Sequence, residues 1–84
     1  SDATIGGTVS GLTGTLVLQN NGGNPLATAT NGPFTFTSLI QNGSPYSVTV
    51  RTQPTGQTCT VANGTGTATA NVTNVAVTAQ LLRF

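Results

Sequence analysis

Residues 46–51 read Tyr-Ser-Val-Thr-Val-Arg, and this stretch decides the fold class. Apolar and polar side chains alternate along it, so that Tyr46, Val48 and Val50 would share one face of an extended chain. The same period of two recurs in residues 34–36 and again in residues 58–61. Because no segment shows the period of 3.6 typical of a helix, the alternation predicts β-strands throughout.

Turn signals divide the chain into short segments of similar length. Asn-Gly is the strongest short hairpin signal, because both residues tolerate a positive φ. Turn signals recur about every ten residues, the spacing typical of short antiparallel strands. The sequence therefore predicts an all-β fold, an antiparallel β-sandwich of seven or eight short strands in a single domain over residues 1–84. The signals are Asn21-Gly22, Asn31-Gly32, Asn42-Gly43, Gln53-Pro54-Thr55-Gly56 and Asn63-Gly64.

The phase of the alternation also predicts the core. Between Val72 and Val75 the apolar residues change phase, which would turn the side chains to the opposite face unless a bulge intervenes. We expect that bulge at Thr73-Asn74. The predicted core residues are Phe34, Phe36, Tyr46, Val48, Val50, Cys59, Val61, Val75 and Val77.

The composition excludes most chemistry. Thr occurs eighteen times, whereas the charged residues are only Asp2, Arg51 and Arg83, and the chain has no His, Lys, Glu, Trp or Met. General acid–base catalysis needs a suitable titratable side chain, a metal site needs clustered ligands, and nucleic-acid binding needs clustered cations. No apolar run approaches the ~18 residues that span a bilayer. We therefore expect no enzymatic activity, no cofactor, no nucleic-acid partner and no membrane insertion.

Four segments of the chain together form a pattern. They are residues 7–11 (Gly-Thr-Val-Ser-Gly), 16–18 (Leu-Val-Leu), 31–36 (Asn-Gly-Pro-Phe-Thr-Phe) and 46–50 (Tyr-Ser-Val-Thr-Val). In this order they resemble the transthyretin-like, or carboxypeptidase-regulatory-like, β-sandwich, which is also used in the B-type repeats of collagen adhesins.

Residues 16–23, 57–61 and 71–78 carry a closer resemblance. They are similar to modules found in tandem in large secreted bacterial proteins. This resemblance implies an immunoglobulin-like sandwich and an extracellular or cell-surface location, but no known activity. In that group a second Cys commonly follows the last strand, at the position that Ala79 occupies here.

Cys59 has two interpretations. It could be a reactive or intermolecular thiol, but no His or Lys is present to lower its pKa. A small buried hydrophobic residue is the favoured interpretation. We expect Cys59 to be buried and unpaired, facing inward like Ala79.

The leading functional hypothesis is a non-enzymatic building block of a bacterial extracellular assembly, whose partners are copies of itself or neighbouring repeats. It could be a fibre or pilus-like subunit joined by β-strand addition, or a stalk repeat of a surface adhesin. In the first case, one of two terminal segments, residues 3–10 or 75–84, would complete a neighbour's sheet. The residues expected to fill the neighbour's groove or to approach its backbone are Ile5, Gly7, Val9, Val75, Val77, Leu81 and Phe84.

The alternative hypothesis is a carbohydrate- or surface-binding module. Such a module would present exposed aromatic rings for stacking on sugars. Phe34, Phe36 and Tyr46 are all in the core phase, which leaves Phe84 as the free candidate.

Overall fold

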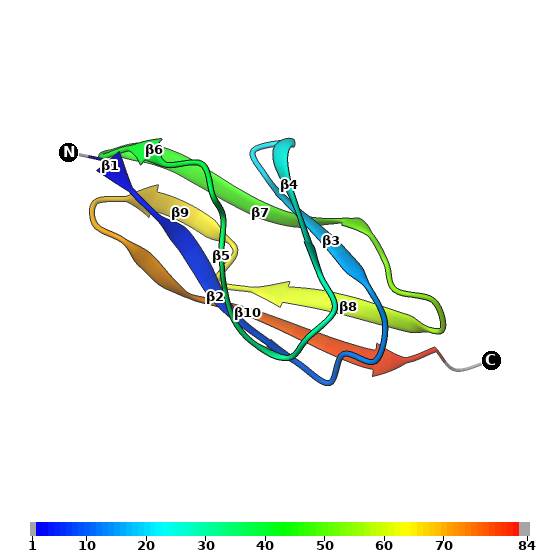
Figure 1. The fold of residues 1–84 in the computed structure, drawn as a ribbon. Coiled ribbons are helices and arrows are strands. Elements are labelled where there is room, and N and C mark those ends of the chain that lie inside the picture. Colours follow the sequence, from blue (N-terminus) through cyan, green and yellow to red (C-terminus); the bar gives the residue numbers. More distant parts are fainter. Residues whose placement is uncertain (1, 83–84) are drawn as a thin grey trace.

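A computed structural model describes residues 2–82, and this part of the chain is all-β, with no helix. Eight of its strands form two four-stranded sheets, ordered β5-β2-β10-β8 and β4-β3-β7-β9, and β1 pairs with β6 in a short two-stranded ribbon (Figure 1). The strands are β1 (Asp2–Ala3), β2 (Ile5–Ser10), β3 (Leu16–Asn20), β4 (Gly23–Thr28), β5 (Gly32–Thr35), β6 (Ile40–Gln41), β7 (Ser44–Thr52), β8 (Gln57–Ala62), β9 (Thr65–Ala68) and β10 (Val72–Leu81).

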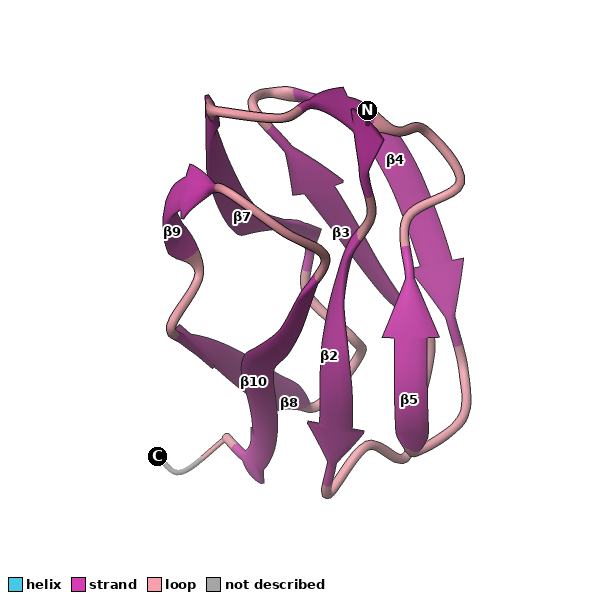
Figure 2. Cartoon of the chain, turned by 90° about the vertical axis from the view of Figure 1, so that its left-hand side faces the viewer, coloured by secondary structure: helices cyan, strands magenta, loops and turns pink. Residues whose placement is uncertain are grey.

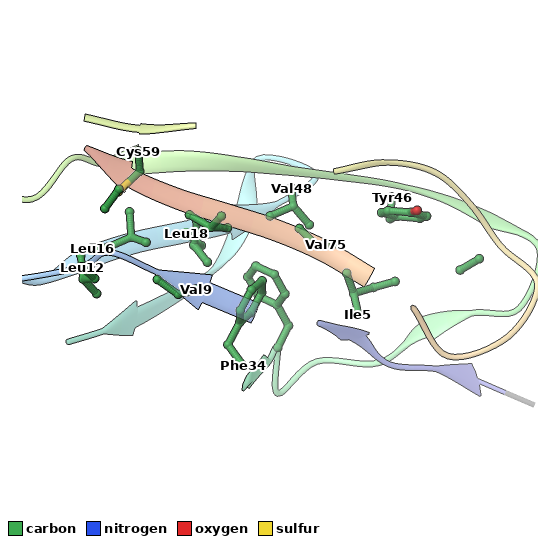
Figure 3. Close-up of a cluster of buried hydrophobic side chains, with 14 of the residues drawn as sticks. Ile5, Val9, Leu12, Leu16, Leu18, Phe34, Tyr46, Val48, Cys59 and Val75 are labelled. Atoms are coloured by element: carbon green, nitrogen blue, oxygen red, sulfur yellow. The ribbon is translucent and has the colours of Figure 1, made fainter. Parts of the chain in front are cut away.

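The two sheets pack face to face as a β-sandwich, as predicted (Figure 2). Side chains from both sheets fill the space between them, with Ile5, Leu16 and Leu18 completely buried (Figure 3). The rings of Phe34 and Phe36 meet edge to face, with centroids 6.0 Å apart, a favourable arrangement for aromatic pairs.

Most of the predicted core residues are buried, and two are not. Val50 and Val61 are half-buried and pack against the core from its border. Val61 lies on β8, an edge strand, so one flank of its side chain faces solvent. Val50 lies beside the register shift where β7 meets β3. The positions were predicted on the correct face, but alternation does not reveal which strand lies at an edge.

The pairing of β2 with β10 differs from the expected antiparallel arrangement, because these two strands run parallel. The alternation of side chains is the same in both kinds of pairing, so the sequence pattern does not distinguish them. The bulge predicted at Thr73-Asn74 is confirmed, since the register with β2 shifts between Val72 and Val75.

Glycines allow this parallel pair to approach closely. A Cβ atom added at Gly7 would collide with the carbonyl oxygen of Val75, next to the bulge, and one added at Gly6 would collide with the carbonyl oxygen of Phe34 on β5. The two glycines therefore let the backbones of three neighbouring strands meet without side-chain interference.

Only one of the four Asn-Gly pairs closes a hairpin. Asn21 and Gly22 have φ of 55° and 75° and join β3 to β4, as a type I′ turn requires. Each of the other three leads the chain from one sheet to another, so the hairpin signal at these positions marks a turn but not a pairing.

Candidate functional site

The two ends of the sandwich hold the features that the sequence left unexplained. The molecule measures 45 × 19 × 18 Å, and the chain enters at one tip of the long axis and leaves at the other (Figure 1). The N-terminal end contains β1 and β6, and the C-terminal end contains the last residues of β10. This placement follows from the parallel pairing of β2 and β10, which begin at the same end of their sheet.

Titratable side chains are sparse in the described part of the chain. Asp2 is exposed at the N-terminal end, and Arg51 is exposed on β7. Residues 2–82 contain no group of three or more His, Cys, Asp or Glu side chains that could hold a metal ion. The same residues include no helix long and apolar enough to cross a membrane.

Cys59 is buried and unpaired, as predicted, with 4% of its surface exposed. Burial raises the pKa of its thiol above the ordinary value of 9.0. Because the thiolate is the reactive form, this shift makes Cys59 a poor nucleophile at neutral pH. Its neighbour across the strand pair is Ala79, which also faces the core.

The residues predicted to complete a neighbour's sheet lie inside the chain's own sandwich. Ile5 and Val9 on β2, and Val75 and Val77 on β10, are each at most 1% exposed. Both strands are central, so each is hydrogen-bonded to a strand on either side.

Three other members of that predicted set have different positions. Gly7 makes its close backbone approach to Val75 of the same chain. Leu81 is 74% exposed at the end of β10. Phe84 lies outside the described residues.

Side-chain amides fasten the loops at the C-terminal end, a feature that sequence reasoning missed. Asn31 accepts a hydrogen bond from the Leu12 amide at 2.7 Å and donates one to the Leu12 carbonyl at 3.1 Å. Gln57 accepts from the Thr13 amide at 2.9 Å and donates to the Gly11 carbonyl at 2.8 Å. Each carboxamide thus substitutes for a strand partner, without any charge.

Gln53 makes a third bond pair of the same kind, to Cys59 on the outer edge of β8. Its Oε1 accepts from the Cys59 amide at 2.7 Å, and its Nε2 donates to the Cys59 carbonyl at 3.2 Å. The backbone groups of Cys59 therefore point away from β10, and Cys59 and Ala79 form a non-hydrogen-bonded cross-strand pair. The signal in the sequence was the presence of Asn and Gln where charged residues are scarce.

Among residues 2–82, one buried side-chain polar group has no hydrogen-bond partner, and it lies at the end of β3. Asn20, 1% exposed, accepts a hydrogen bond from the Ser47 amide at 3.1 Å, while its Nδ2 has no partner among the protein atoms. At the N-terminal end, the Asn71 side chain accepts from the Thr4 amide at 3.0 Å, and the Thr4 carbonyl accepts from the Val72 amide at 2.8 Å. These last two bonds fix the start of β10 against the start of β2.

The aromatic side chains are not arranged for sugar stacking. Phe34, Phe36 and Tyr46 are all buried, so no described aromatic ring is exposed. The Tyr46 ring lies directly beneath Gly66 of β9, where an added Cβ would be 2.9 Å from the Tyr46 hydroxyl oxygen.

Comparison with known proteins identifies no relative: no family model matches the chain, and neither does any curated protein or any solved structure.

Proposed function

We propose that this chain is a non-enzymatic structural module of a bacterial extracellular assembly, and that it acts as a stalk repeat arranged end to end with its neighbours. The observation that carries the proposal is the parallel pairing of β2 and β10. A force applied to the two ends of the chain would pull these neighbouring strands past each other along their length. The hydrogen bonds between them would then resist together, whereas strands peeled apart from one end break their bonds one after another.

Further features support a role under tension. The Thr73-Asn74 bulge and the close approach at Gly7 interlock β10 with β2, so that sliding would require both to be undone. The amide pairs of Asn31, Gln53 and Gln57 hold the loops at the C-terminal end without charges, and therefore without sensitivity to salt. The extracellular setting rests on the scarcity of charge and on the resemblance to tandem modules of immunoglobulin-like or transthyretin-like type.

The stalk form is favoured over strand addition by the position of the terminal strands. Donating residues 3–10 or 75–84 to a neighbour would break hydrogen bonds on both sides of a central strand and would remove fully buried side chains from the core. Ladder bonds gained in the neighbour would replace those lost, but the donor's own core would stay open.

Single-molecule stretching tests the proposal. The chain is pulled through its two termini in one experiment and through Phe84 and a Cys introduced at Thr55 in the other. Thr55 lies in the turn at the C-terminal end, where the Gly56 carbonyl accepts from the Leu82 amide, so the second geometry peels β8 from β10. We expect a several-fold higher unfolding force through the termini, with roughly 250 Å released per module. An equal or lower force through the termini would refute a role under tension.

A further inference from the structure

The outer edge of β9 carries backbone groups that no neighbouring strand uses. β9 is the last strand of its sheet and pairs with β7 alone. In this register the Val48 amide of β7 donates to the Gly64 carbonyl at 2.7 Å, just before β9 begins. Successive residues of an antiparallel strand face the partner and face away in turn. The N–H and C=O groups of Thr65 and Thr67 therefore point outward from the sheet.

This edge is open, whereas the other edges are guarded. In the described part of the chain the two four-stranded sheets have four edge strands. β4 contains Pro25, β5 contains Pro33, and the middle of β8 is covered by the Gln53 amide. β9 contains neither a proline nor a charged residue. An unguarded edge is a place where a further strand can pair.

A depression of about 250 Å³ lies beside the same edge. It is lined by Tyr46, Thr67 and residues 69–74, and so lies between β9 and the start of β10 (Figure 2). None of these residues is charged. Gly66, which pairs with Tyr46, has no side chain to fill the space, and a Cβ there would be 2.9 Å from the Tyr46 hydroxyl oxygen. The phenol group therefore forms part of the floor of the depression.

We propose that β9 binds an extended, uncharged peptide segment of another protein by strand addition, with one peptide side chain entering the depression. The N–H and C=O groups of Thr65 and Thr67 pair with the peptide backbone. Directly opposed residues of two strands share a face, so the peptide residue opposite Gly66 points toward Tyr46. A side chain with a hydroxyl or carboxamide group fits there, because it can hydrogen-bond to the Tyr46 hydroxyl.

A second copy of the chain fits this site less well than a peptide does. Two β9 strands related by a two-fold axis pair through all their outward groups only when Thr65 lies opposite Thr67. That register places Gly66 opposite Gly66, so no side chain enters either depression. A sugar fits less well too, since the described residues expose no aromatic ring on which it could stack.

The site is short, and its affinity is correspondingly low. Two outward-facing residues supply four backbone hydrogen-bonding groups, so we expect a dissociation constant in the roughly millimolar range. Binding of this strength is compatible with isolated copies that stay apart from one another.

Titration of the isotopically labelled chain with capped peptides, followed by amide NMR shifts, tests the site. The probe is Ala-Val-Ser-Val-Ala, and the matched probe has Ala in place of the central Ser. We expect saturable shifts at Thr65 and Thr67 with the Ser peptide. The Ala peptide should bind about fivefold more weakly, because it lacks the hydrogen bond to Tyr46.

Thr67→Pro should abolish the shifts, because it removes an outward N–H without removing a bond to β7. Thr35→Pro is the matched control: the Phe36 amide donates to the Ile5 carbonyl, so the Thr35 amide also points outward, but from β5. This variant should bind the Ser peptide as the parent does. If Thr67→Pro impairs folding, as judged by circular dichroism, Tyr46→Phe provides a second test, since it should remove the preference for Ser over Ala.

Several results would overturn the proposal. One is the lack of any shift at Thr65 and Thr67 with peptide up to about 10 mM, well above the expected dissociation constant. Others are equal binding by Thr67→Pro and Thr35→Pro, or a preference for Ser that survives Tyr46→Phe. Shifts at the same residues on concentrating the chain without peptide would identify a second copy as the occupant, and shifts with a neutral oligosaccharide would identify a sugar.

Discussion

At the residue scale, the hydrogen bonds made by Gln53 determine how Cys59 and Ala79 face each other across the strand pair. The Gln53 amide makes hydrogen bonds to the backbone N–H and C=O of Cys59, so these groups make none to Ala79. Cys59 and Ala79 are therefore a non-hydrogen-bonded cross-strand pair, the kind in which the two residues lie closer together. Such sites have Cα atoms about 4.5 Å apart, within the range that a disulfide spans. The site has the geometry for a disulfide, and only the second sulfur is missing.

Ala79→Cys should therefore form a disulfide with Cys59 under oxidising conditions. The bond would close a loop of about twenty residues and should raise the free energy of unfolding by about 3 kcal/mol. Urea denaturation with and without reductant measures the effect, and reduction should return the variant close to the parent. Two free thiols in the oxidised, folded variant would contradict the register.

The buried thiol should also make stability depend on pH. Because burial raises the pKa of Cys59, the folded chain keeps this proton to higher pH than the unfolded chain does. The contribution to stability is fully present below about pH 9, the unfolded value, and is lost as pH rises through the folded pKa. The free energy of unfolding between pH 7 and 11 should fall more for the parent than for Cys59→Ala. Parallel curves for the two proteins would show that folding does not raise the pKa of Cys59.

At the element scale, the decisive contact is the one between β2 and β10. Gly7 and the Thr73-Asn74 bulge meet at the same point of the ladder, so the missing side chain and the extra residue compensate for each other. Both features were visible in the sequence, as a Gly-Gly step and as a change of phase. The sequence did not show that the two features contact each other, because the alternation within a strand does not indicate which strand pairs with it.

Gly7→Ala should therefore be destabilising, by about 1–3 kcal/mol, because the added methyl group collides with the Val75 carbonyl oxygen. Gly23→Ala is the matched control: it lies in β4, where an added Cβ meets nothing within 4 Å, and should change stability by less than about 0.5 kcal/mol. Chemical denaturation of the two variants measures both. Equal costs would mean that β2 and β10 are not in close contact at this point.

At the scale of the whole molecule, the arrangement predicts a single chain that stays apart from its copies. The central positions of β2 and β10 satisfy both terminal strands internally, and the edge strands are short, proline-containing or covered. Among residues 2–82 the large exposed hydrophobic side chains are those of Leu39, Leu81 and Leu82, which are too few to hold free chains together.

We accordingly expect the isolated 84-residue chain to sediment as a monomer up to high micromolar concentration and to form no fibres in electron micrographs. Fibres formed by the intact chain, and lost on deleting residues 3–10 or 75–84, would instead establish strand addition. Deleting either segment from a monomeric module should simply unfold it.

The sequence by itself determined the fold class, the faces of most strands, the bulge and the burial of Cys59. These properties depend on the alternation and phase of neighbouring residues, which are local and can be read along the chain. The tertiary structure alone decided that β2 and β10 are parallel, that three Asn-Gly turns join different sheets, and that Gln53, Asn31 and Gln57 act as strand partners. Each of these depends on which distant segments meet, and the same alternating pattern is compatible with many different pairings.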